Sequence, residues 1–588
     1  MMCWTWEAWA DVIIDFGREL YIPWRLVEGE VLYRDLAHFN GPLSPYVNAL
    51  WFRSFGTSLR VLSLANLTIL ALLLALLYSL VARMGSRTSA FLASMTFVLV
   101  FAFSELGYNL NYVCPYSHEM THGLLLSLVA ILFVRRFADD GRLANAGLSG
   151  LCVGAVFLTK PEIFLAVFPA TAIGLAMILW LQRPAWQNVF ALGGTFAAAV
   201  LAPPLLSLCL LSLAMPLSEA LAGTLGGFRW IFSSEITALP FYRRLRGTYD
   251  LQTTAYRFFV IGIGYALLMG LPAVLGLLWR KREKARLPAA LSIFAIAVAL
   301  LWRFQWHLPW AYAFLPLPLL ALAAIGSLVT RFVRSRTVAE RCQLVAPISF
   351  ATFSLLLMAK VFLAARVDNY GFVLAAPGMF LAVAFLWDWL PRAIDARDGT
   401  GLPLRAGVLA ALVMANVAML QAQKIALDLR TVRVGSGSDA IWWNARGQEV
   451  NRVLHQIERQ LPLDGTFAVA PEGIMLNYLT RRRNPTHHIS YMPLEMLLFG
   501  EEQMISGFAQ GPPDAVLVVN RDLAFYDLKP FGEGYALQLR DWLVDHYQPV
   551  DSAPVEPGMF HITFLKLRKA AAAATAPGNV GDENVIGP

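Results

Sequence analysis

Apolar runs dominate the first 422 residues of this chain, and short polar stretches separate them. Many of the runs reach the roughly 20 residues that a helix needs to cross a bilayer core. A helix is the only open structure that can span lipid, because the bilayer offers its backbone amides no other partner. The pattern predicts twelve spans, at about 59–81, 88–107, 119–137, 143–159, 161–182, 188–214, 257–279, 287–302, 310–330, 344–365, 373–391 and 404–422.

Residues 423–568 follow a different pattern, in which short β-rich runs alternate with stretches of helical periodicity. This alternation predicts a soluble α/β domain with helices packed on a small sheet. The last residues, 569–588, are of low complexity and are expected to be disordered. The predicted strands are TFAVA (466–470), AVLVV (515–519) and HITFLKL (561–567), and the predicted helices are NARGQEVNRVLHQIERQL (444–461), EMLLFGEEQMISGF and LQLRDWLVDHY.

Composition agrees with a polytopic membrane protein. Hydrophobic residues make up 57% of the 588, and charged residues only 15%, whereas a soluble protein carries roughly 25% charged residues. The formal net charge of +7 would suit a nucleic-acid partner if the bases were clustered. They lie instead in every second connection between spans, so nucleic acid is excluded as an expected partner. These bases are Arg83, Arg87, Arg135, Arg136, Arg142, Arg183, Arg280, Lys281, Arg282, Lys284, Arg286, Arg331, Arg334, Arg336, Arg341, Arg392, Arg397 and Arg405.

Short loops rich in Lys and Arg stay in the cytoplasm, which puts the segment 1–58 and the domain 423–568 on the outer side. An outer N-terminal segment normally follows a membrane span or a cleaved signal peptide. The apolar run from Trp4 to Ile14 is too short to span and contains Glu7 and Asp11. We therefore expect that a first transmembrane helix is missing from this sequence.

Polar residues at the outer ends of spans are the candidate chemistry, because charges at the membrane are costly and tend to be functional. Asp15 and Glu19 are four residues apart and would share one face of a helix. Their mutual repulsion would raise the pKa of one carboxyl toward that of a useful general base. The alternative is that Glu19 simply pairs with Arg18 or Arg25 on a wet surface.

Lys160-Pro161-Glu162 forms a tight turn between two spans, and Pro161 suits the first turn of the second helix. Such a lysine and glutamate could hold a lipid phosphate or a sugar hydroxyl, although both could also snorkel to the interface.

Residues 118–122 spell H-E-x-x-H, a pattern in which both imidazoles of a helix can bind zinc. The sequence offers no convincing third ligand, and its five cysteines are scattered without metal-binding spacing. We therefore expect His118, Glu119 and His122, with Asp35 and Tyr116, to line the mouth of an outer cavity.

Four segments resemble a known family. The run DFGRELYIPWRLVEGEVLYRDLAHFNGPLSPYVNALWFRSFGTSLRVLSLAN (15–66) resembles the first outer loop and second span of GT-C-fold glycosyltransferases. The family 39-like bacterial enzymes, which include lipid A aminoarabinose transferases and protein O-mannosyltransferases, are the most similar. NYVCPYSHEMTHG, GLCVGAVFLTKPEIFLA and, in the C-terminal domain, APEGIMLNYLTRRRNP are similar to further segments of bacterial members.

The resemblance implies a mechanism in which a sugar moves from a polyprenyl-phosphate donor to an acceptor hydroxyl, with inversion. An aspartate of the first outer loop is the general base in this family, and Asp15 matches its position. Members often carry Asp-Glu there, whereas Phe16 follows Asp15 here, so Glu19 is the candidate acidic partner. A family lysine that contacts the lipid phosphate corresponds to Asn40, in Asn40-Gly41-Pro42-Leu43. The replacement charge is expected from Arg18, Arg34, His38, Lys160 or Arg303, with Glu162 beside them.

These observations predict a GT-C-type helical membrane protein with a C-terminal α/β domain, in the inner membrane of a bacterium, that needs no metal or other cofactor. Its partners would be a polyprenyl-linked sugar, a lipid, glycan or protein acceptor, and membrane lipids. Two alternatives stay open: an intramembrane zinc metalloprotease built on residues 118–122, and a transporter of lipid-linked sugars without catalytic activity.

Overall fold

The computed structural model describes residues 1–107, 109–279, 283–550 and 559–568. The chain divides into two compact units, Met1–Ala445 and Arg446–Pro588, and each is described by itself. The tail 569–588, predicted to be disordered, lies outside the described residues, as does part of the basic run that begins at Arg280.

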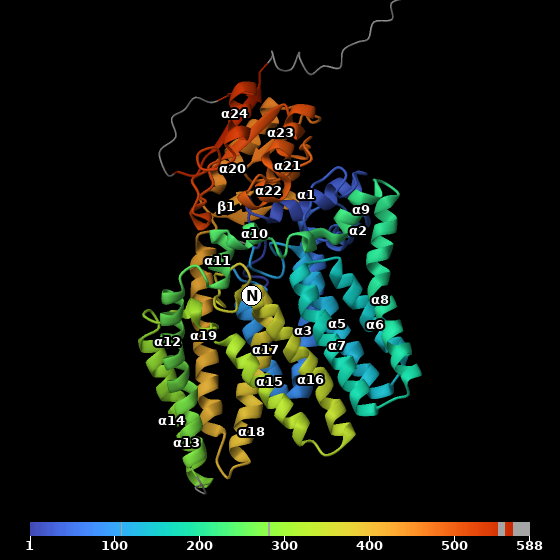
Figure 1. The fold of residues 1–588 in the computed structure, drawn as a ribbon. Coiled ribbons are helices and arrows are strands. Elements are labelled where there is room, and N and C mark those ends of the chain that lie inside the picture. Colours follow the sequence, from blue (N-terminus) through green and yellow to red (C-terminus); the bar gives the residue numbers. More distant parts are fainter. Residues whose placement is uncertain (108, 280–282, 551–558, 569–588) are drawn as a thin grey trace, which may run out of the picture. The chain divides into compact units, whose positions relative to one another are not determined.

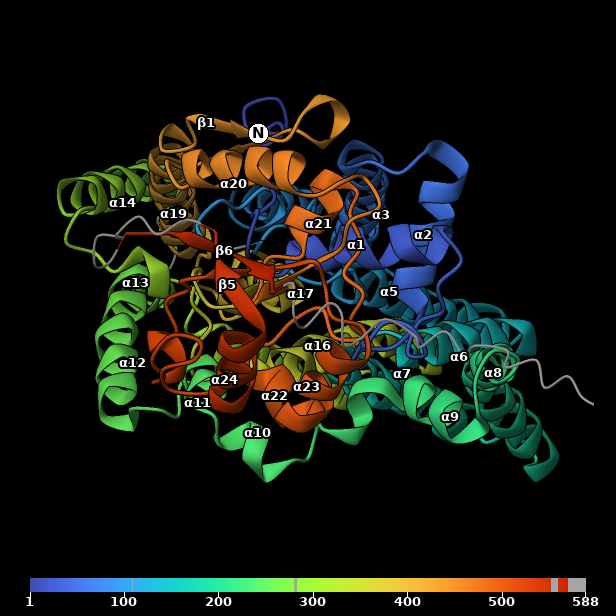
Figure 2. The same ribbon diagram turned by 90° about the horizontal axis from the view of Figure 1, so that it is seen from above.

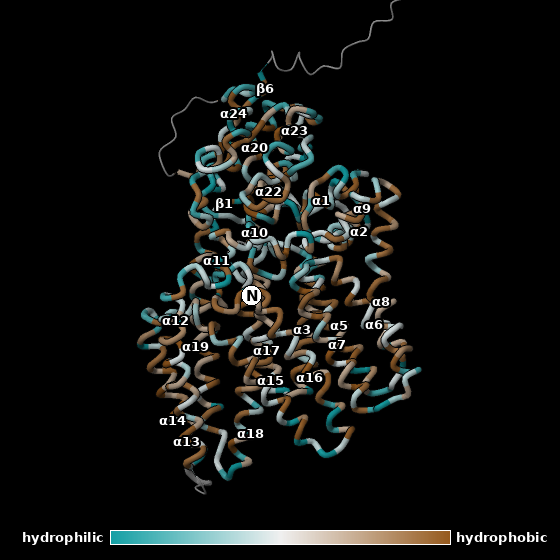
Figure 3. Tube along the Cα trace, viewed as in Figure 1, coloured by the Kyte–Doolittle hydropathy of each residue, from teal (hydrophilic) through white to brown (hydrophobic). Residues whose placement is uncertain are grey.

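Unit 1 is a bundle of apolar helices (Figures 1 and 3). Within the described residues, ten helical segments are long and apolar enough to cross a membrane. They are formed by α3 (Leu59–Met84), α5 (His118–Asp140), α7 (Pro161–Gln182), α8 (Trp186–Ser212), α12 (Leu251–Tyr265) continued by α13 (Leu271–Leu278), α14 (Glu283–Arg303), α15 (Leu317–Arg334), α16 (Val338–Leu357), α17 (Ala376–Ala384) continued by α18 (Leu390–Asp395), and α19 (Leu402–Asp428).

Two further apolar helices are shorter. α4 (Arg87–Thr96) continues as a π-helical turn to Ala102, and α6 spans Leu143–Phe157. Each of the twelve predicted spans therefore corresponds to a helical segment, and the predicted polytopic helical fold is confirmed. The predicted boundaries at 107 and 257 were wrong, because the second helix ends at Ala102 and α12 begins at Leu251.

Local sequence signals set several helix ends. The hydroxyl of Ser58 accepts a hydrogen bond from the amide of Val61 and caps α3. Thr337 and Glu340 form a reciprocal capping box at the start of α16. Pro161 occupies the first turn of α7, where a missing amide hydrogen costs no helical bond. These caps satisfy backbone groups that the first turn of a helix leaves unpaired.

Small residues let the helices approach closely. Gly150 and Gly154 of α6 face α8, and an added Cβ at either would clash with the carbonyl of Phe196 or Val200. Gly174 of α7 lies against Ser349 of α16 in the same way. The group α12–α14 and the group α6–α8 lie on opposite sides of unit 1 in both Figure 1 and Figure 2.

Two of the predicted cytoplasmic loops, near residues 85 and 392, meet at one end of the bundle. The indole of Trp389 donates to the carbonyl of Met84 (2.9 Å), and Ser86 Oγ donates to Asp388 (2.9 Å). Arg392 reaches the carbonyl of Gly85 at 3.2 Å. The basic connections near residues 85 and 392 therefore share one end of the bundle, as the charge pattern predicted.

Short elements gather at the other end of unit 1. They are α1 (Phe16–Val27) and α2 (Leu43–Phe55) before the first long helix, α9 (Leu217–Leu225), α10 (Ser234–Ala238) and α11 (Pro240–Arg246) before α12, and the antiparallel hairpin of β1 (Val432–Val434) and β2 (Ile441–Trp443). The hairpin contacts the start of the chain, because the amide of Trp442 donates to the carbonyl of Glu7 at 2.8 Å.

Unit 2 has the predicted α/β architecture. The order of its four-stranded sheet is β3-β4-β6-β5, in which β3 and β4 are parallel and the other pairs antiparallel. Helices pack on the sheet around a core that includes Tyr491, Met504 and Phe508. Its elements are α20 (Gly447–Gln460), β3 (Phe467–Ala470), α21 (Met475–Thr480), α22 (Pro493–Phe499), α23 (Glu501–Gln510), β4 (Ala515–Val519), α24 (Leu537–His546), β5 (Tyr547–Pro549) and β6 (Ile562–Leu567).

Two details of this domain differ from the sequence-based prediction. The predicted helix EMLLFGEEQMISGF is two helices, because Gly500 adopts a φ of 85° that ends α22. The predicted start at residue 423 was also too early: α19 continues to Asp428, and the hairpin 432–443 belongs to unit 1.

A buried ion pair joins the end of the last long helix to the rest of unit 1. Arg430 Nη2 lies 2.6 Å from Glu105 Oε2, and the same guanidinium reaches the carbonyls of Ala10 (3.5 Å) and Trp442 (3.3 Å). Burial raises the pKa of Glu105 from 4.5 to about 8, although Arg430 opposes the shift. The folded protein therefore binds this proton more tightly than the unfolded chain.

This pair predicts a pH dependence of stability. The contribution of Glu105 is fully present below its ordinary pKa of 4.5 and is lost as pH rises through about 8. Glu105→Gln, which stays neutral, should flatten this part of the profile. The measurement is the unfolding temperature in detergent across this pH range. Glu219→Gln, at an exposed acid of α9, is the control and should leave the profile unchanged; the same flattening in both variants would contradict the assignment.

Candidate active site

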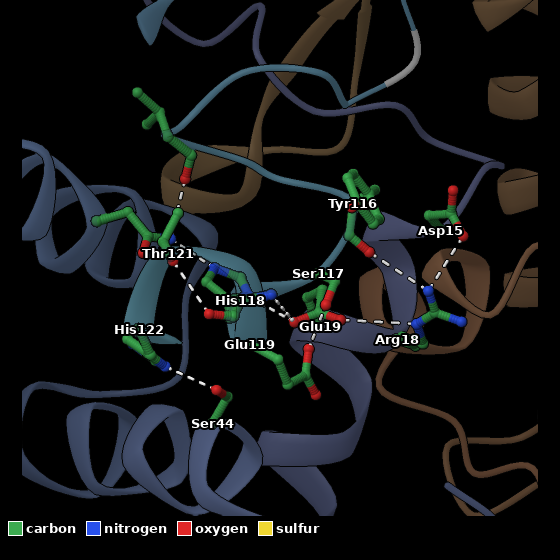
Figure 4. A network of polar contacts seen from close by, with 12 residues as sticks. Asp15, Arg18, Glu19, Ser44, Tyr116, Ser117, His118, Glu119, Thr121 and His122 are labelled. Carbon is green, nitrogen blue, oxygen red and sulfur yellow. Dashed lines mark hydrogen bonds and ion pairs between the residues drawn. The ribbon is translucent and has the colours of Figure 1, made fainter. Parts of the chain in front are cut away.

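Several of the predicted site residues lie close together at the end of unit 1 that carries α1 and α2. α1 presents Arg18 and Glu19, α5 begins at His118, and α7 begins directly after Lys160. Figure 4 shows the polar contacts that link α1 and α2 to the start of α5.

Asp15 does not share a helical face with Glu19, which corrects the prediction from their spacing. Asp15 precedes α1 and has a φ of 55°, outside helical geometry. Arg18 contacts both acids, at 3.1 Å from Asp15 Oδ1 and 3.6 Å from Glu19 Oε1. The guanidinium therefore separates two carboxylates that the sequence placed in mutual repulsion.

Glu19 is held by the first residue of α5. Its Oε2 accepts from the backbone amide of His118 (3.0 Å) and lies 2.5 Å from His118 Nδ1. Both side chains are buried, so this contact joins α1 to α5 where water has no access. Of the two predicted partners Arg18 and Arg25, only Arg18 contacts Glu19, since Arg25 pairs with Glu30 at 2.7 Å.

The tautomer of His118 follows from its neighbours. Asn66 Nδ2 donates to the carbonyl of Val113 (2.9 Å), which fixes the orientation of that amide. The same nitrogen lies 2.5 Å from His118 Nε2, which must accept, so Nδ1 carries the proton given to Glu19. Neither ring nitrogen of His118 keeps a lone pair for a metal.

The other residues of the H-E-x-x-H pattern also bind protein groups. Glu119 accepts from His38 Nε2 (3.1 Å) and from Ser117 Oγ, and His122 Nδ1 lies 2.9 Å from Ser44 Oγ. Among the described residues, no group of three His, Cys, Asp or Glu side chains could hold a metal ion. This geometry does not support the metalloprotease alternative. The side chains of His118, Glu119 and His122 instead bind α1, the segment 28–42 and α2, and so hold these elements against α5.

Lys160 stands out among the charged groups. Its side chain is buried, and its ammonium lies 4.4 Å from the ring centroid of Tyr116. It interacts electrostatically with Glu119 and Glu162. Among the described residues, Lys160 forms no hydrogen bond or ion pair within bonding distance. Glu162, in contrast, pairs with Lys360 at 3.2 Å.

The segment Asn40-Gly41-Pro42-Leu43 is fastened to the turn before Lys160. The amide of Gly41 donates to the carbonyl of Thr159 (2.9 Å), and that of Leu43 to the carbonyl of Leu158 (3.0 Å). Asn40 is buried, and its Nδ2 has no partner within the residues that the structure describes. Asn40, which the resemblance matches to a family lysine, therefore lies beside the turn that precedes Lys160.

Two predicted binding residues do not join the site. Arg34 and Asp35 pair with each other at 2.7 Å, and the Arg34 side chain is 44% exposed. Arg303 is exposed and lies over the ring of Phe304. Neither contacts the network around Glu19 and Lys160.

Sequence reasoning missed several residues that the site uses. Lys360 and Asn66 lie inside apolar runs, and a lone polar side chain in such a run was the available signal. Tyr370 also was not predicted; its ring centroid lies 4.4 Å from that of Tyr116.

Comparison with known proteins finds one family model that matches part of the chain. Residues 40–207 match the model of the dolichyl-phosphate-mannose-protein mannosyltransferase family. The family resemblance seen in the sequence is confirmed over this segment. The match indicates an enzyme of glycosyltransferase type; it includes Lys160 and Glu119 but begins after Asp15 and Glu19. No curated protein matches the chain significantly in sequence.

Solved structures give weaker similarities. ArnT from Cupriavidus metallidurans in the apo state is 12% identical, with a TM-score of 0.46, and the match covers 97% of this chain and 96% of that one. The same protein bound to undecaprenyl phosphate matches with 12% identity, 98% and 97% coverage and a TM-score of 0.44. An Archaeoglobus fulgidus oligosaccharyltransferase in complex with Zn and sulfate is 14% identical, with a TM-score of 0.45. That match covers 87% of this chain, which spans only 65% of the archaeal protein. Because their TM-scores lie below 0.5, these similarities carry no argument about the function of this protein.

The close backbone contact at Gly41 yields a test of the site's architecture. A Cβ at this position would approach the Leu158 carbonyl oxygen well within the van der Waals contact distance of the two atoms. Gly41→Ala should therefore destabilise the protein by about 1–3 kcal/mol, seen as a lower unfolding temperature in detergent. Gly194→Ala in α8, where nothing lies within 4 Å of the added Cβ, is the matched control. Equal unfolding temperatures for the two variants would contradict the close approach.

Proposed function

We propose that this protein transfers a sugar from a polyprenyl-phosphate donor to an acceptor hydroxyl, with inversion, at the outer face of a bacterial inner membrane. The observation that carries the proposal is the presence of an acid, Asp15, and a buried lysine, Lys160, at one end of the bundle. Asp15 precedes α1, and the buried ammonium of Lys160 precedes α7, with Arg18, Tyr116 and Glu119 linking them. The family match over residues 40–207 supports the reaction class.

The charges divide into paired and available groups. Glu19 is hydrogen-bonded to His118, Glu119 to His38, and Glu162 forms an ion pair with Lys360. Lys160 is left to meet the negative charge of a lipid phosphate in a site of low dielectric, where such a contact is strong. Asn40 Nδ2, buried and unpaired among the described residues, would supply a neutral donor in place of the family lysine.

In the proposed reaction the Asp15 carboxylate takes the proton of the acceptor hydroxyl. The acceptor oxygen forms a bond to the anomeric carbon from the side opposite the phosphate. The bond between that carbon and the phosphate oxygen breaks, and its electron pair leaves with the phosphate, whose charge Lys160 stabilises. Because Glu19 is committed to His118, we assign it the role of holding α1 in place rather than of touching substrate.

The outer location rests on the loop charges. The basic connections near residues 85 and 392 share one end of the bundle, and Asp15, His118 and Lys160 lie at the other. Since basic loops remain in the cytoplasm, the site and the C-terminal unit would be extracytoplasmic. No metal or other cofactor takes part in the proposed reaction.

Replacement of the proposed base tests the reaction. Asp15→Asn should preserve folding and membrane insertion and lower kcat by about 10²–10⁴-fold. The measurement is release of polyprenyl phosphate from a panel of synthetic polyprenyl-phosphate sugars, together with mass analysis of envelope glycans in a deletion strain. Asp35→Asn, at an acid that pairs with exposed Arg34, is the control. Activity kept in Asp15→Asn and lost in Asp35→Asn would sink the assignment, and lipid movement without sugar release would favour the transporter alternative.

Removal of the lysine tests the phosphate contact. Lys160→Met keeps the length of the side chain and deletes its charge, so KM for the lipid-linked donor should rise by about 10–100-fold, the usual cost of a charge-assisted contact. Lys424→Met, at an exposed lysine that pairs with Asp428, should leave KM unchanged. A normal KM in Lys160→Met would show that another group holds the phosphate.

A further inference from the structure

The backbone around Asp15 has a rare and strained geometry. Asp15 has φ 55° and ψ −56°, and the amide of Phe16 donates to the carbonyl of Ile14 at 2.6 Å. This is a γ-turn of the positive-φ form, which non-glycine residues seldom adopt. Such a conformation persists only where surrounding contacts hold it.

One side chain contacts this turn directly and also the chain before it. Asn109 Nδ2 donates to the carbonyl of Ile14 (2.7 Å), the same oxygen that closes the γ-turn, and Asn109 Oδ1 accepts from the amide of Asp11 (2.8 Å). Asn109 is 2% exposed. Its amide thus spans residues 11–14 and fastens both ends of that stretch to the loop before α5.

Other contacts hold the earlier part of the N-terminal strap, which we define as residues 5–15. Asp11 Oδ1 accepts from the amides of Ile13 and Ile14, both at 2.8 Å, and Asp11 Oδ2 accepts from Trp443 Nε1 at 3.3 Å. Asn111 Nδ2 donates to the carbonyl of Trp9 at 2.9 Å. These bonds anchor the strap to unit 1, but none of them reaches the carbonyl that forms the turn at Asp15.

We infer that Asn109 is a positioning residue for Asp15: it stabilises the γ-turn that aims the carboxylate toward the acceptor. This inference rests on the proposed function. Without the bond from Asn109, the turn would relax toward a common conformation and the carboxylate would leave its reactive position, while the donor site around Lys160 would be untouched. A misplacement of about 1 Å can lower a rate by about 100-fold.

Asn109→Gly is the most specific test of this positioning role. Asn109 itself has a φ of 52°, which glycine adopts without strain, so the substitution deletes both hydrogen bonds and keeps the loop conformation. Two effects are expected in the full-length protein in detergent. Hydrogen exchange of the amides from Ile13 to Phe16 should become faster, and kcat for release of polyprenyl phosphate should fall by about 10–100-fold with KM for the donor unchanged.

Asn111→Ala is the control, because it removes an amide bond to the same strap at Trp9 rather than at Ile14. It also removes the bonds that Asn111 Oδ1 accepts from the amides of Val113 and Cys114, so it perturbs the loop before α5 at least as strongly. It should leave kcat within about threefold of wild type. Equal losses of kcat in the two variants would overturn the inference, since they would reflect general loosening of the strap. So would wild-type exchange at residues 13–16 in Asn109→Gly, or faster exchange with kcat intact.

Asp15→Asn separates this inference from the proposed function. If Asp15→Asn is inactive and Asn109→Gly fully active, the positioning role fails and the general base stands. If Asp15→Asn is fully active, the proposed base fails, and the role of Asn109 in catalysis falls with it, whatever the exchange of residues 13–16 shows about the turn.

Discussion

The contact between Glu19 and His118 is the constraint on which the candidate site depends. A buried carboxylate is costly unless hydrogen bonds satisfy it, and here the imidazole and the backbone amide of His118 both do so. Asn66 fixes the imidazole from the other side. The pair thus connects α1, α3 and α5, three elements that are far apart in sequence, at a point that excludes water.

The other acids of the site follow the same rule with other partners. Glu119 is paired with His38, and Glu162 with Lys360, so two more segments are drawn to the N-terminal ends of α5 and α7. What remains is Lys160, whose ammonium lies over the ring of Tyr116. A site in which the acids have other basic partners and one buried ammonium has no ion pair of its own among the described residues is suited to a ligand that brings its own negative charge.

The N-terminal strap is firmly bound to the rest of unit 1, and it ends in the strained backbone conformation of Asp15. The hairpin of β1 and β2, Arg430 and Trp443 hold the beginning of the chain, and Asn109 holds its last residues before α1. Asp15 is thus placed by backbone contacts rather than by its own side chain alone. Strained residues of this kind tend to occur where a reactive group needs a defined direction.

The sequence by itself determined the membrane class, the helices, the two ends of the bundle and the α/β character of unit 2, because hydrophobic periodicity and loop charge are local properties. It also identified Asp15, His118 and Lys160 as residues of one end. Only the tertiary structure decided how they combine. Spacing alone put Asp15 and Glu19 in repulsion and left zinc binding by His118 open as an alternative. In the structure Arg18 lies between the two acids, and long-range contacts with Asn66 and Glu19 occupy His118. The roles of Lys360 and Asn109 also depend on tertiary structure, since hydrogen bonds between residues 198 and 95 positions apart leave no periodic pattern in the sequence.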